Sequence, residues 1–220
     1  VISNVIENAT SGINISRSEV IFVEDNTIND TREGILLTHV EDSVMIKNSI
    51  SNSSMGFNTD NVTGSLLVEN HLSECDIGLE IRDSKLSSII NNEIMGGRIG
   101  ISTFNLVDAN IWENRISGAD DTGIYVVGPF AASMLEIIDN HLMSNNAGIR
   151  IRNGTIMLVA SNTIEKSSSF GLDLEARTTE IDVNGNVFMD NNPGGDQAND
   201  DGLSNTWYLP WPAGGNFWSD

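Results

Sequence analysis

Asparagine and glycine recur along this chain in a fixed phase with apolar residues. An Asn followed two residues later by an apolar residue occurs at Asn4, Asn26, Asn48, Asn70, Asn92, Asn114, Asn140, Asn162 and Asn186, and six of the eight steps are 22 residues long. A Gly lies eight or nine residues after each of the first eight, at Gly12, Gly34, Gly56, Gly78, Gly100, Gly123, Gly148 and Gly171. This period predicts nine to ten stacked coils of about 22 residues each.

Each repeat divides into three short strands. After the Gly, apolar and polar residues alternate, as in residues 12–15 and 148–151, which is the period of a half-buried strand. A second strand leads to the Asn, because the residue three positions before it is always apolar (Val23, Met45, Leu67, Ile89, Ile111, Ile137, Val159 and Val183). A third, brief strand follows the Asn. Leucine-rich repeats are excluded, since their leucine spacing and helical return are both missing.

Three strands per coil predict an all-β fold, a right-handed parallel β-helix with coils about 4.8 Å apart. Each Asn is expected to bond to the Asn of the next coil, and each Gly to supply a backbone angle that other residues resist. We assign residues 1–190 to the coils. Residues 191–220 are predicted to form an acidic turn and an aromatic cap over the open β edge, with Trp207, Tyr208, Trp211, Phe217 and Trp218.

The composition limits the partners and the cellular locations that can be expected for this single domain of 220 residues. Its net charge of −20 disfavours nucleic acid and anionic lipid as partners. No apolar run reaches 18 residues, so no membrane span is expected. One cysteine, Cys75, excludes an internal disulfide framework and a cysteine-based zinc site. Since Val1 lies in mid-repeat, we expect a mature fragment or excised domain, located outside the cell or on its surface.

The tail carries the most specific motifs. They are Ala198-Asn199-Asp200-Asp201-Gly202, Asn205-Thr206-Trp207 and Gly214-Gly215-Asn216-Phe217-Trp218-Ser219-Asp220. Together with the Asn repeat, they resemble the NosD-like β-helix repeats, also called carbohydrate-binding and sugar-hydrolysis (CASH) repeats, of archaeal and bacterial surface proteins. NosD itself is associated with maturation of a copper site. This chain departs from that role, because His39, His71 and His141 lie on different coils and only one Cys is present.

The outward positions of the strand after Gly form two columns in which a first charged cluster stands out. Asp60 and Glu80, with Asn58 beside them, lie on adjacent coils and two positions apart along the strand. Strand geometry places the backbones of Asp60 and Glu80 about 8 Å apart. That separation suits an inverting glycosidase pair. Resemblance to polysaccharide lyases implies another chemistry, with Arg82 as base or charge neutraliser and the acids as calcium ligands. Alternatively, Asp60 and Arg82 form a simple surface ion pair of small energetic value.

A second cluster lies farther along the same columns and has the pattern of cross-strand charge complementarity. It comprises Arg150 and Arg152 opposite Asp173 and Glu175, with Phe104 and Tyr125 nearby. One interpretation is a clamp for a sugar acid or sulfate, with the two aromatic rings as stacking platforms. The other is a charge ladder on a solvated sheet.

Two further features have both a functional and a structural interpretation. Asp190, Asp196, Asp200 and Asp201 gather hard oxygen ligands among glycines, which predicts a calcium site or else an acidic turn that caps the last coil. Apolar residues also occupy outward positions of the second strand, at Val44, Ile46, Leu66, Val68, Ile90, Trp112 and Ile138. Such a stripe is typical of a contact with another subunit or domain, unless a long turn covers it.

Three functions are compatible with this sequence. The first is a cell-surface β-helix module with a structural or adhesive role that contacts polysaccharide or cell-envelope glycan. The second is a polysaccharide lyase or glycoside hydrolase that acts on an acidic polysaccharide through Asp60, Glu80 and Arg82. The third is an oligomeric envelope protein that assembles through the apolar stripe. Few coils exceed the basic length, and short loops favour a scaffold over an enzyme with a walled cleft.

Overall fold

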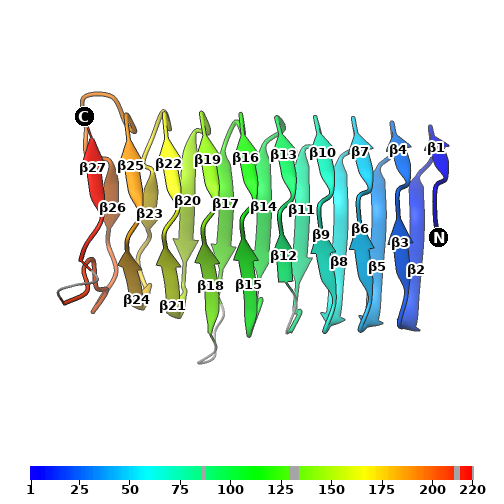
Figure 1. The fold of residues 1–220 in the computed structure, drawn as a ribbon, viewed down its shortest axis with the longest axis horizontal. Coiled ribbons are helices and arrows are strands. Elements are labelled where there is room, and N and C mark those ends of the chain that lie inside the picture. Colours follow the sequence, from blue (N-terminus) through cyan, green and yellow to red (C-terminus); the bar gives the residue numbers. More distant parts are fainter. Residues whose placement is uncertain (86–87, 129–133, 211–213, 220) are drawn as a thin grey trace.

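The computed structural model describes residues 1–85, 88–128, 134–210 and 214–219, and every regular element in them is a β-strand. The strands form three parallel sheets that wind into a solenoid, with the termini at opposite ends (Figure 1). The prediction of a parallel β-helix is therefore confirmed. The described part of the chain contains no helix with the length and hydrophobicity needed to span a bilayer.

Each coil contributes one strand to each of three sheets. The nine-stranded sheet holds β2 (Ser11–Glu19), β5 (Glu33–Glu41), β8 (Met55–Thr63), β11 (Ile77–Arg82), β14 (Ile99–Phe104), β17 (Thr122–Val127), β20 (Ala147–Arg152), β23 (Leu172–Leu174) and β26 (Ala198–Asp200). The eight-stranded sheet holds β3 (Phe22–Glu24), β6 (Val44–Ile46), β9 (Leu66–Val68), β12 (Ser88–Ile90), β15 (Ala109–Trp112), β18 (Leu135–Ile138), β21 (Thr155–Ala160) and β24 (Thr179–Asn184). The ten-stranded sheet holds β1 (Val5–Glu7), β4 (Thr27–Asn29), β7 (Ser49–Ser51), β10 (His71–Ser73), β13 (Glu93–Met95), β16 (Arg115–Ser117), β19 (His141–Met143), β22 (Thr163–Glu165), β25 (Val187–Met189) and β27 (Phe217–Ser219).

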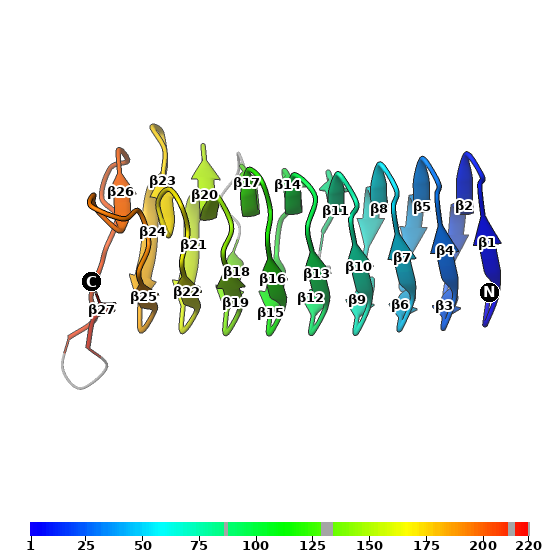
Figure 2. The ribbon, with the colours of Figure 1, turned by 90° about the horizontal axis from the view of Figure 1, so that it is seen from above.

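The strands pair in strict register, so equivalent residues of successive coils lie side by side (Figure 2). Ile28, Ile50 and Leu72, for example, stack in one column of the ten-stranded sheet, and all three are completely buried. Because side chains alternate between the two faces of a strand, most three-residue strands contribute one apolar residue to the core, whereas longer strands contribute more, as Ile35, Leu37 and Val40 of β5 do. The interior is thus a set of columns of like apolar residues, as the sequence predicts.

The Asn ladder is the main polar element of the interior. Each Asn side chain accepts from the backbone and carboxamide N–H groups of the preceding rung, as Asn114 does from Asn92 at 2.9 Å for both bonds. The ladder also extends one rung beyond the repeat found in the sequence, since Asn216 Oδ1 accepts from Asn186 Nδ2 at 2.9 Å. These bonds satisfy backbone groups at a corner, where the residue before the Asn adopts a positive φ, as Lys47 and Glu113 do.

The repeated glycines are required for a different reason from the one expected. Gly12, Gly34, Gly56, Gly78 and the other repeated glycines do not lie in the left-handed region, so the predicted need for an unusual backbone angle is wrong. A Cβ added to Gly34 would instead lie 2.5 Å from the carbonyl oxygen of Gly56 and 2.6 Å from Cγ2 of Ile50. Glycine is needed here because the backbones of successive coils approach too closely for any side chain.

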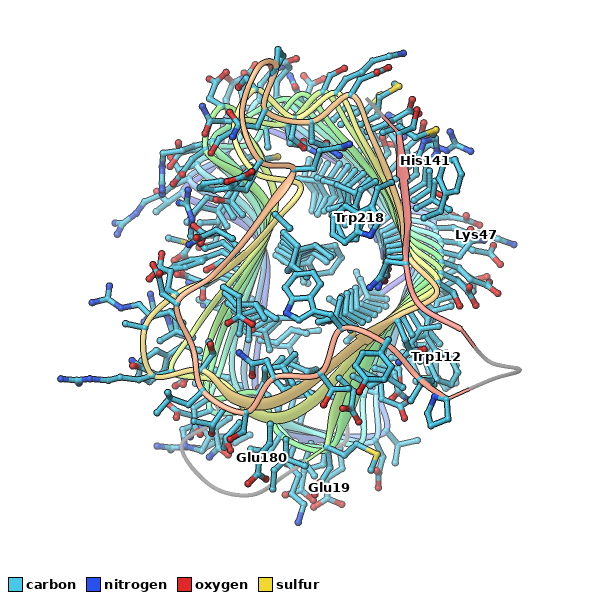
Figure 3. All side chains as sticks on the ribbon, turned by 90° about the vertical axis from the view of Figure 1, so that its left-hand side faces the viewer. Glu19, Lys47, Trp112, His141, Glu180 and Trp218 are labelled. Carbon is cyan, nitrogen blue, oxygen red and sulfur yellow. The ribbon has the colours of Figure 1, made fainter. Side chains whose placement is uncertain are left out.

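The C-terminal segment adds strands to two sheets and covers the end of the core. β26 pairs with β23, and β27 pairs with β25. Trp218 stacks on Phe188 with a centroid distance of 4.4 Å and lies over the interior in a view along the axis (Figure 3). The ring centroids of Trp207 and Trp218 are 6.0 Å apart, whereas Trp211 and Asp220 lie outside the described residues. That residues 191–220 form a distinct cap remains a prediction.

Candidate functional site

The outer face of the nine-stranded sheet gathers most of the predicted site residues into three columns. The second and third columns follow from the register of the paired strands. One consists of Asn58, Glu80, Ser102, Tyr125, Arg150, Asp173 and Asn199, and the other of Asp60, Arg82, Phe104, Val127 and Arg152. Glu175 and Asp201 continue the third column directly beyond the ends of β23 and β26. The first column, one residue before β11, β14 and β17, contains Asp76, Arg98 and Asp121. We call this surface the charged face.

Glu80 is the most unusual residue of the charged face. Although its position points outward, it is only 7% exposed, and its carboxylate Oε1 lies 2.6 Å from Nη2 of Arg82. The structure thus pairs Arg82 with Glu80 on its own strand rather than with Asp60 on the neighbouring strand. Asp60 is half-buried, and its carboxylate makes no hydrogen bond or ion pair with the described residues. The three predicted catalytic residues therefore lie together, with Glu80 neutralised and the Asp60 carboxylate open.

Two aromatic residues form the apolar centre of the charged face. Phe104, at the end of β14, is 39% exposed, and Tyr125 on β17 is half-buried. Tyr125 pairs in register with Ser102 on one side and with Arg150 on the other. The rings therefore lie between the Glu80–Arg82 pair and the arginine cluster. Flat apolar rings beside polar groups can hold a ligand that has both apolar and hydroxyl-bearing faces.

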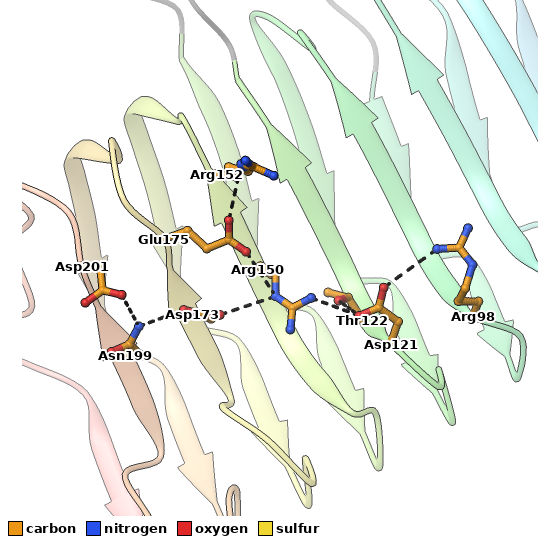
Figure 4. Close-up of polar contacts among 9 residues, drawn as sticks. All are labelled: Arg98, Asp121, Thr122, Arg150, Arg152, Asp173, Glu175, Asn199 and Asp201. Atoms are coloured by element: carbon orange, nitrogen blue, oxygen red, sulfur yellow. Dashed lines mark hydrogen bonds and ion pairs between the residues drawn. The ribbon is translucent and has the colours of Figure 1, made fainter.

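Arg150 is the centre of a network of ion pairs and hydrogen bonds on the charged face (Figure 4). Its Nη1 lies 3.0 Å from Oδ1 of Asp121, and its Nε lies 3.5 Å from Asp173 and 3.6 Å from Glu175. Glu175 also lies 3.7 Å from Nε of Arg152. The predicted cross-strand pairs are thus present; three carboxylates lie around the Arg150 guanidinium, and one lies beside that of Arg152. Such a network holds its side chains in place, and the carboxylates offset much of the positive charge that a ligand would meet at each arginine.

Sequence reasoning missed the first column of this network. Arg98 lies 3.3 Å from Asp76 and 3.9 Å from Asp121, in ion pairs between successive coils. The signal was available, because Asp76, Arg98 and Asp121 alternate in charge at the position two residues before the repeated Gly. The alternation of apolar and polar residues begins only after the Gly, so it does not predict which way a side chain points at this position.

The residues predicted to bind calcium do not converge. Asp200 instead anchors the tail: its Oδ1 accepts from Gly202 N at 2.9 Å and Asn205 Nδ2 at 2.8 Å, and its Oδ2 accepts from Trp207 Nε1 at 2.8 Å. Asp201 Oδ2 accepts from Asn199 Nδ2 at 3.2 Å. Within the described residues, no group of three or more His, Cys, Asp or Glu side chains could hold a metal ion. Asp190 and Asp196 thus form no such group, and calcium binding remains a prediction.

The apolar stripe lies on the outer side of the eight-stranded sheet, as predicted. Its residues alternate with buried core residues along each strand, and most are half-buried, while Leu66 is 38% exposed. The indole Nε1 of Trp112 is buried and finds no hydrogen-bond partner in the described part of the chain. Whether this stripe contacts another subunit or domain stays a prediction.

The ten-stranded sheet carries a polar row that the sequence did not reveal. His71 Nδ1 lies 3.1 Å from Glu93 Oε2, and His141 Nε2 lies 2.8 Å from Glu165 Oε1. Arg115 Nη1 lies 3.3 Å from His141 Nδ1. Because a guanidinium can only donate, Nδ1 of His141 accepts and its Nε2–H donates to Glu165. That hydrogen bond, together with the nearby charge of Lys166, lowers the pKa of the Glu165 carboxyl.

This lowered pKa predicts a specific response to acid. A carboxyl whose pKa is depressed in the folded state adds stability above its ordinary pKa of 4.5, and this contribution is lost as the pH falls through the lowered value. We therefore expect the carbon-13 NMR titration of Glu165 to have a midpoint below 4.5. In a His141→Ala variant, the midpoint should move upward. A wild-type midpoint at or above 4.5, or one that His141→Ala does not change, would contradict this assignment.

Two family models match the chain. The model described as periplasmic copper-binding protein (NosD) matches residues 1–118, and the model described as right-handed β-helix region matches residues 78–206. Each match covers more than half of the 220 residues. No curated protein matches the sequence.

Solved structures with the same fold include enzymes that act on polysaccharides. The periplasmic alginate epimerase AlgG is 15% identical, with a TM-score of 0.67 over 90% of this chain and 58% of its own. The A-module of the Azotobacter vinelandii mannuronan C-5 epimerase AlgE6 is 14% identical, with a TM-score of 0.69 over 88% and 56%. The DFA-IIIase of Arthrobacter chlorophenolicus A6, in complex with GF2, is 12% identical, with a TM-score of 0.62 over 91% and 68%. The chain spans less than three fifths of the epimerase structures, and identities this low establish the fold alone.

Proposed function

This chain belongs to the NosD family of right-handed parallel β-helix repeats, and from that premise we propose that it is a non-catalytic module that binds an extended glycan outside the cytoplasm. The glycan would lie across the charged face, on the cell surface or in the periplasm. The periplasmic names of the NosD family model and of AlgG support this location.

One observation carries the proposal: the row formed by Glu80–Arg82, Phe104, Tyr125 and Arg150 on consecutive strands. The rings offer stacking surfaces, and the fixed polar groups on both sides offer hydrogen bonds to hydroxyls. Both are features of small, well-oriented binding sites. Only the coil from Asn114 to Asn140, which contains Tyr125 and is 26 residues long, and the 24-residue coil from Asn162 to Asn186 exceed the basic repeat of 22, so the sequence supplies few loops to wall off a catalytic cleft.

Copper does not fit the residues of this chain, although the family name refers to it. His141 is held between Arg115 and Glu165, and His71 is held by Glu93. The thiol of Cys75 is buried, and this burial raises its pKa, which disfavours the thiolate that copper prefers. In the described residues, no group of three or more His, Cys, Asp or Glu side chains has an arrangement that could hold a metal ion. We therefore assign no copper chemistry to this chain.

Removal of the two rings tests the proposal. We expect the chain to bind glycans on an array, and the double variant Phe104→Ala/Tyr125→Ala to lose at least about tenfold in affinity for the tightest of them, measured by calorimetry. Phe22→Ala is the matched control, because Phe22 is 53% exposed on a different sheet. Equal affinity of the double variant and the wild type would contradict a site on the charged face.

A second candidate is a lyase or glycoside hydrolase, favoured by the burial of Glu80 beside the open carboxylate of Asp60. The alginate epimerases of the same fold make a polysaccharide substrate reasonable to test. Reducing-sugar and unsaturated-product assays, with and without calcium, should detect no turnover if the module only binds. Turnover that disappears in Asp60→Ala would replace the binding proposal.

Assembly through the apolar stripe is a further proposal. Sedimentation of an Ile90→Lys/Trp112→Lys variant, compared with the wild type, tests it.

A further inference from the structure

We infer that the charged face selects a glycan that is neutral or carries amines, and that it disfavours polyanionic glycans such as alginate. This inference rests on the proposed function and names the chemical class of its ligand. It also departs from the expectation, drawn from sequence, that the arginines form a clamp for sugar acids or sulfate.

The first argument is that carboxylates already engage every arginine of the charged face. Arg82 contacts Glu80 at 2.6 Å, and Arg152 contacts Glu175 at 3.7 Å. Arg98 is shared between two acids, and Arg150 lies among three. A sugar carboxylate that approached these guanidinium groups would have to share them with a carboxylate of the protein and would meet its like charge.

The second argument is the balance of charge on this surface. From β8 to β26 its three columns carry the seven carboxylates of Asp60, Asp76, Glu80, Asp121, Asp173, Glu175 and Asp201, against the four guanidinium groups of Arg82, Arg98, Arg150 and Arg152. With a chain charge of −20 behind it, this surface repels a polyanion and attracts a cation.

The third argument is the open carboxylate of Asp60. It lies in the same column as Phe104, two strands away, with Arg82 between them. Because Arg82 is paired with Glu80, the group formed by Asp60, Glu80 and Arg82 keeps one net negative charge. An ammonium group on a sugar ring near Phe104 could approach Asp60, whereas a sugar carboxylate there would meet like charge.

Three oligosaccharides of matched length separate these classes: chitosan oligomers with free amines, their N-acetylated neutral counterparts, and alginate oligomers. We expect calorimetry at low ionic strength to give an affinity for the amine series about tenfold above that for alginate, with the neutral series between them. Added salt should weaken amine binding and strengthen alginate binding, because it screens both attraction and repulsion.

Asp60→Asn should reduce the preference for amine over neutral oligomers by about threefold. The control is Asp182→Asn, which makes the same change in net charge on the exposed side of β24 and should leave the preference as it is. Alginate binding as tight as, or tighter than, neutral binding would overturn the inference while the proposed function stands. Failure of all three series, and of the glycan array, to bind would reject the proposed function itself.

Discussion

Replacement of Asn114 by leucine should lower the free energy of unfolding by about 4 kcal/mol, because it leaves buried backbone and side-chain groups without partners, at roughly 1–3 kcal/mol each. Asn114 Nδ2 donates to the carbonyls of Ile89 and Trp112, both at 2.9 Å. Its Oδ1 accepts from the backbone N and the Nδ2 of Asn92, again both at 2.9 Å. Leucine has nearly the same shape but can form none of these bonds.

Urea unfolding of the variant and the wild type measures this loss. The matched control is Asn110→Leu, the same chemical change on the same coil, where the side chain points outward from β15. We expect the control to lose about 1 kcal/mol or less, since the Asn110 side chain is only half-buried and is not part of the ladder. If both variants lose the same amount, the ladder is not a main source of stability.

Replacement of Gly100 by alanine should cost about 3 kcal/mol, near the upper end for an overpacked interior. The added Cβ would lie 2.6 Å from the carbonyl oxygen of Gly123 and 2.5 Å from Cγ2 of Ile116. The oxygen belongs to the backbone of the next coil, so it cannot rotate away. The two coils must therefore separate locally, which lengthens their hydrogen bonds.

Thermal and urea unfolding of Gly100→Ala test this prediction against Gly215→Ala. A Cβ at Gly215 would lie 3.6 Å from its nearest neighbours, in ordinary contact, and the residue is exposed. We expect the control to change stability by no more than about 0.5 kcal/mol. A Gly100→Ala variant as stable as this control would show that the coils can accommodate a methyl group, and that close approach is not why glycine recurs.

The fold could be predicted from the sequence because the same constraint repeats in every coil. Asn, Gly and the inward apolar residue each occupy a fixed position, so the 22-residue period specifies strands, corners and register together. The physical reason for Gly could not be inferred in this way. Periodicity shows that a position tolerates only Gly, but not whether a backbone angle or a neighbouring carbonyl imposes it.

The charged face was predictable only in part, because register assigns a column but not a side-chain direction. It correctly placed Arg150 beside Asp173, since both occupy the same position on neighbouring coils. It did not reveal that Arg82 turns toward Glu80 on its own strand. It also did not reveal that the carboxylate of Asp200 accepts hydrogen bonds from the tail residues Asn205 and Trp207.

Photo-crosslinking of a bound oligosaccharide, with the labelled peptides mapped by mass spectrometry, tests the central claim most directly. If a glycan binds across the charged face, the label should concentrate on peptides that contain Phe104, Tyr125 and Arg150, and unlabelled glycan should compete it away. Labelling that instead concentrates on the apolar stripe or on the Trp207–Trp218 end, or that no free glycan displaces, would contradict the account.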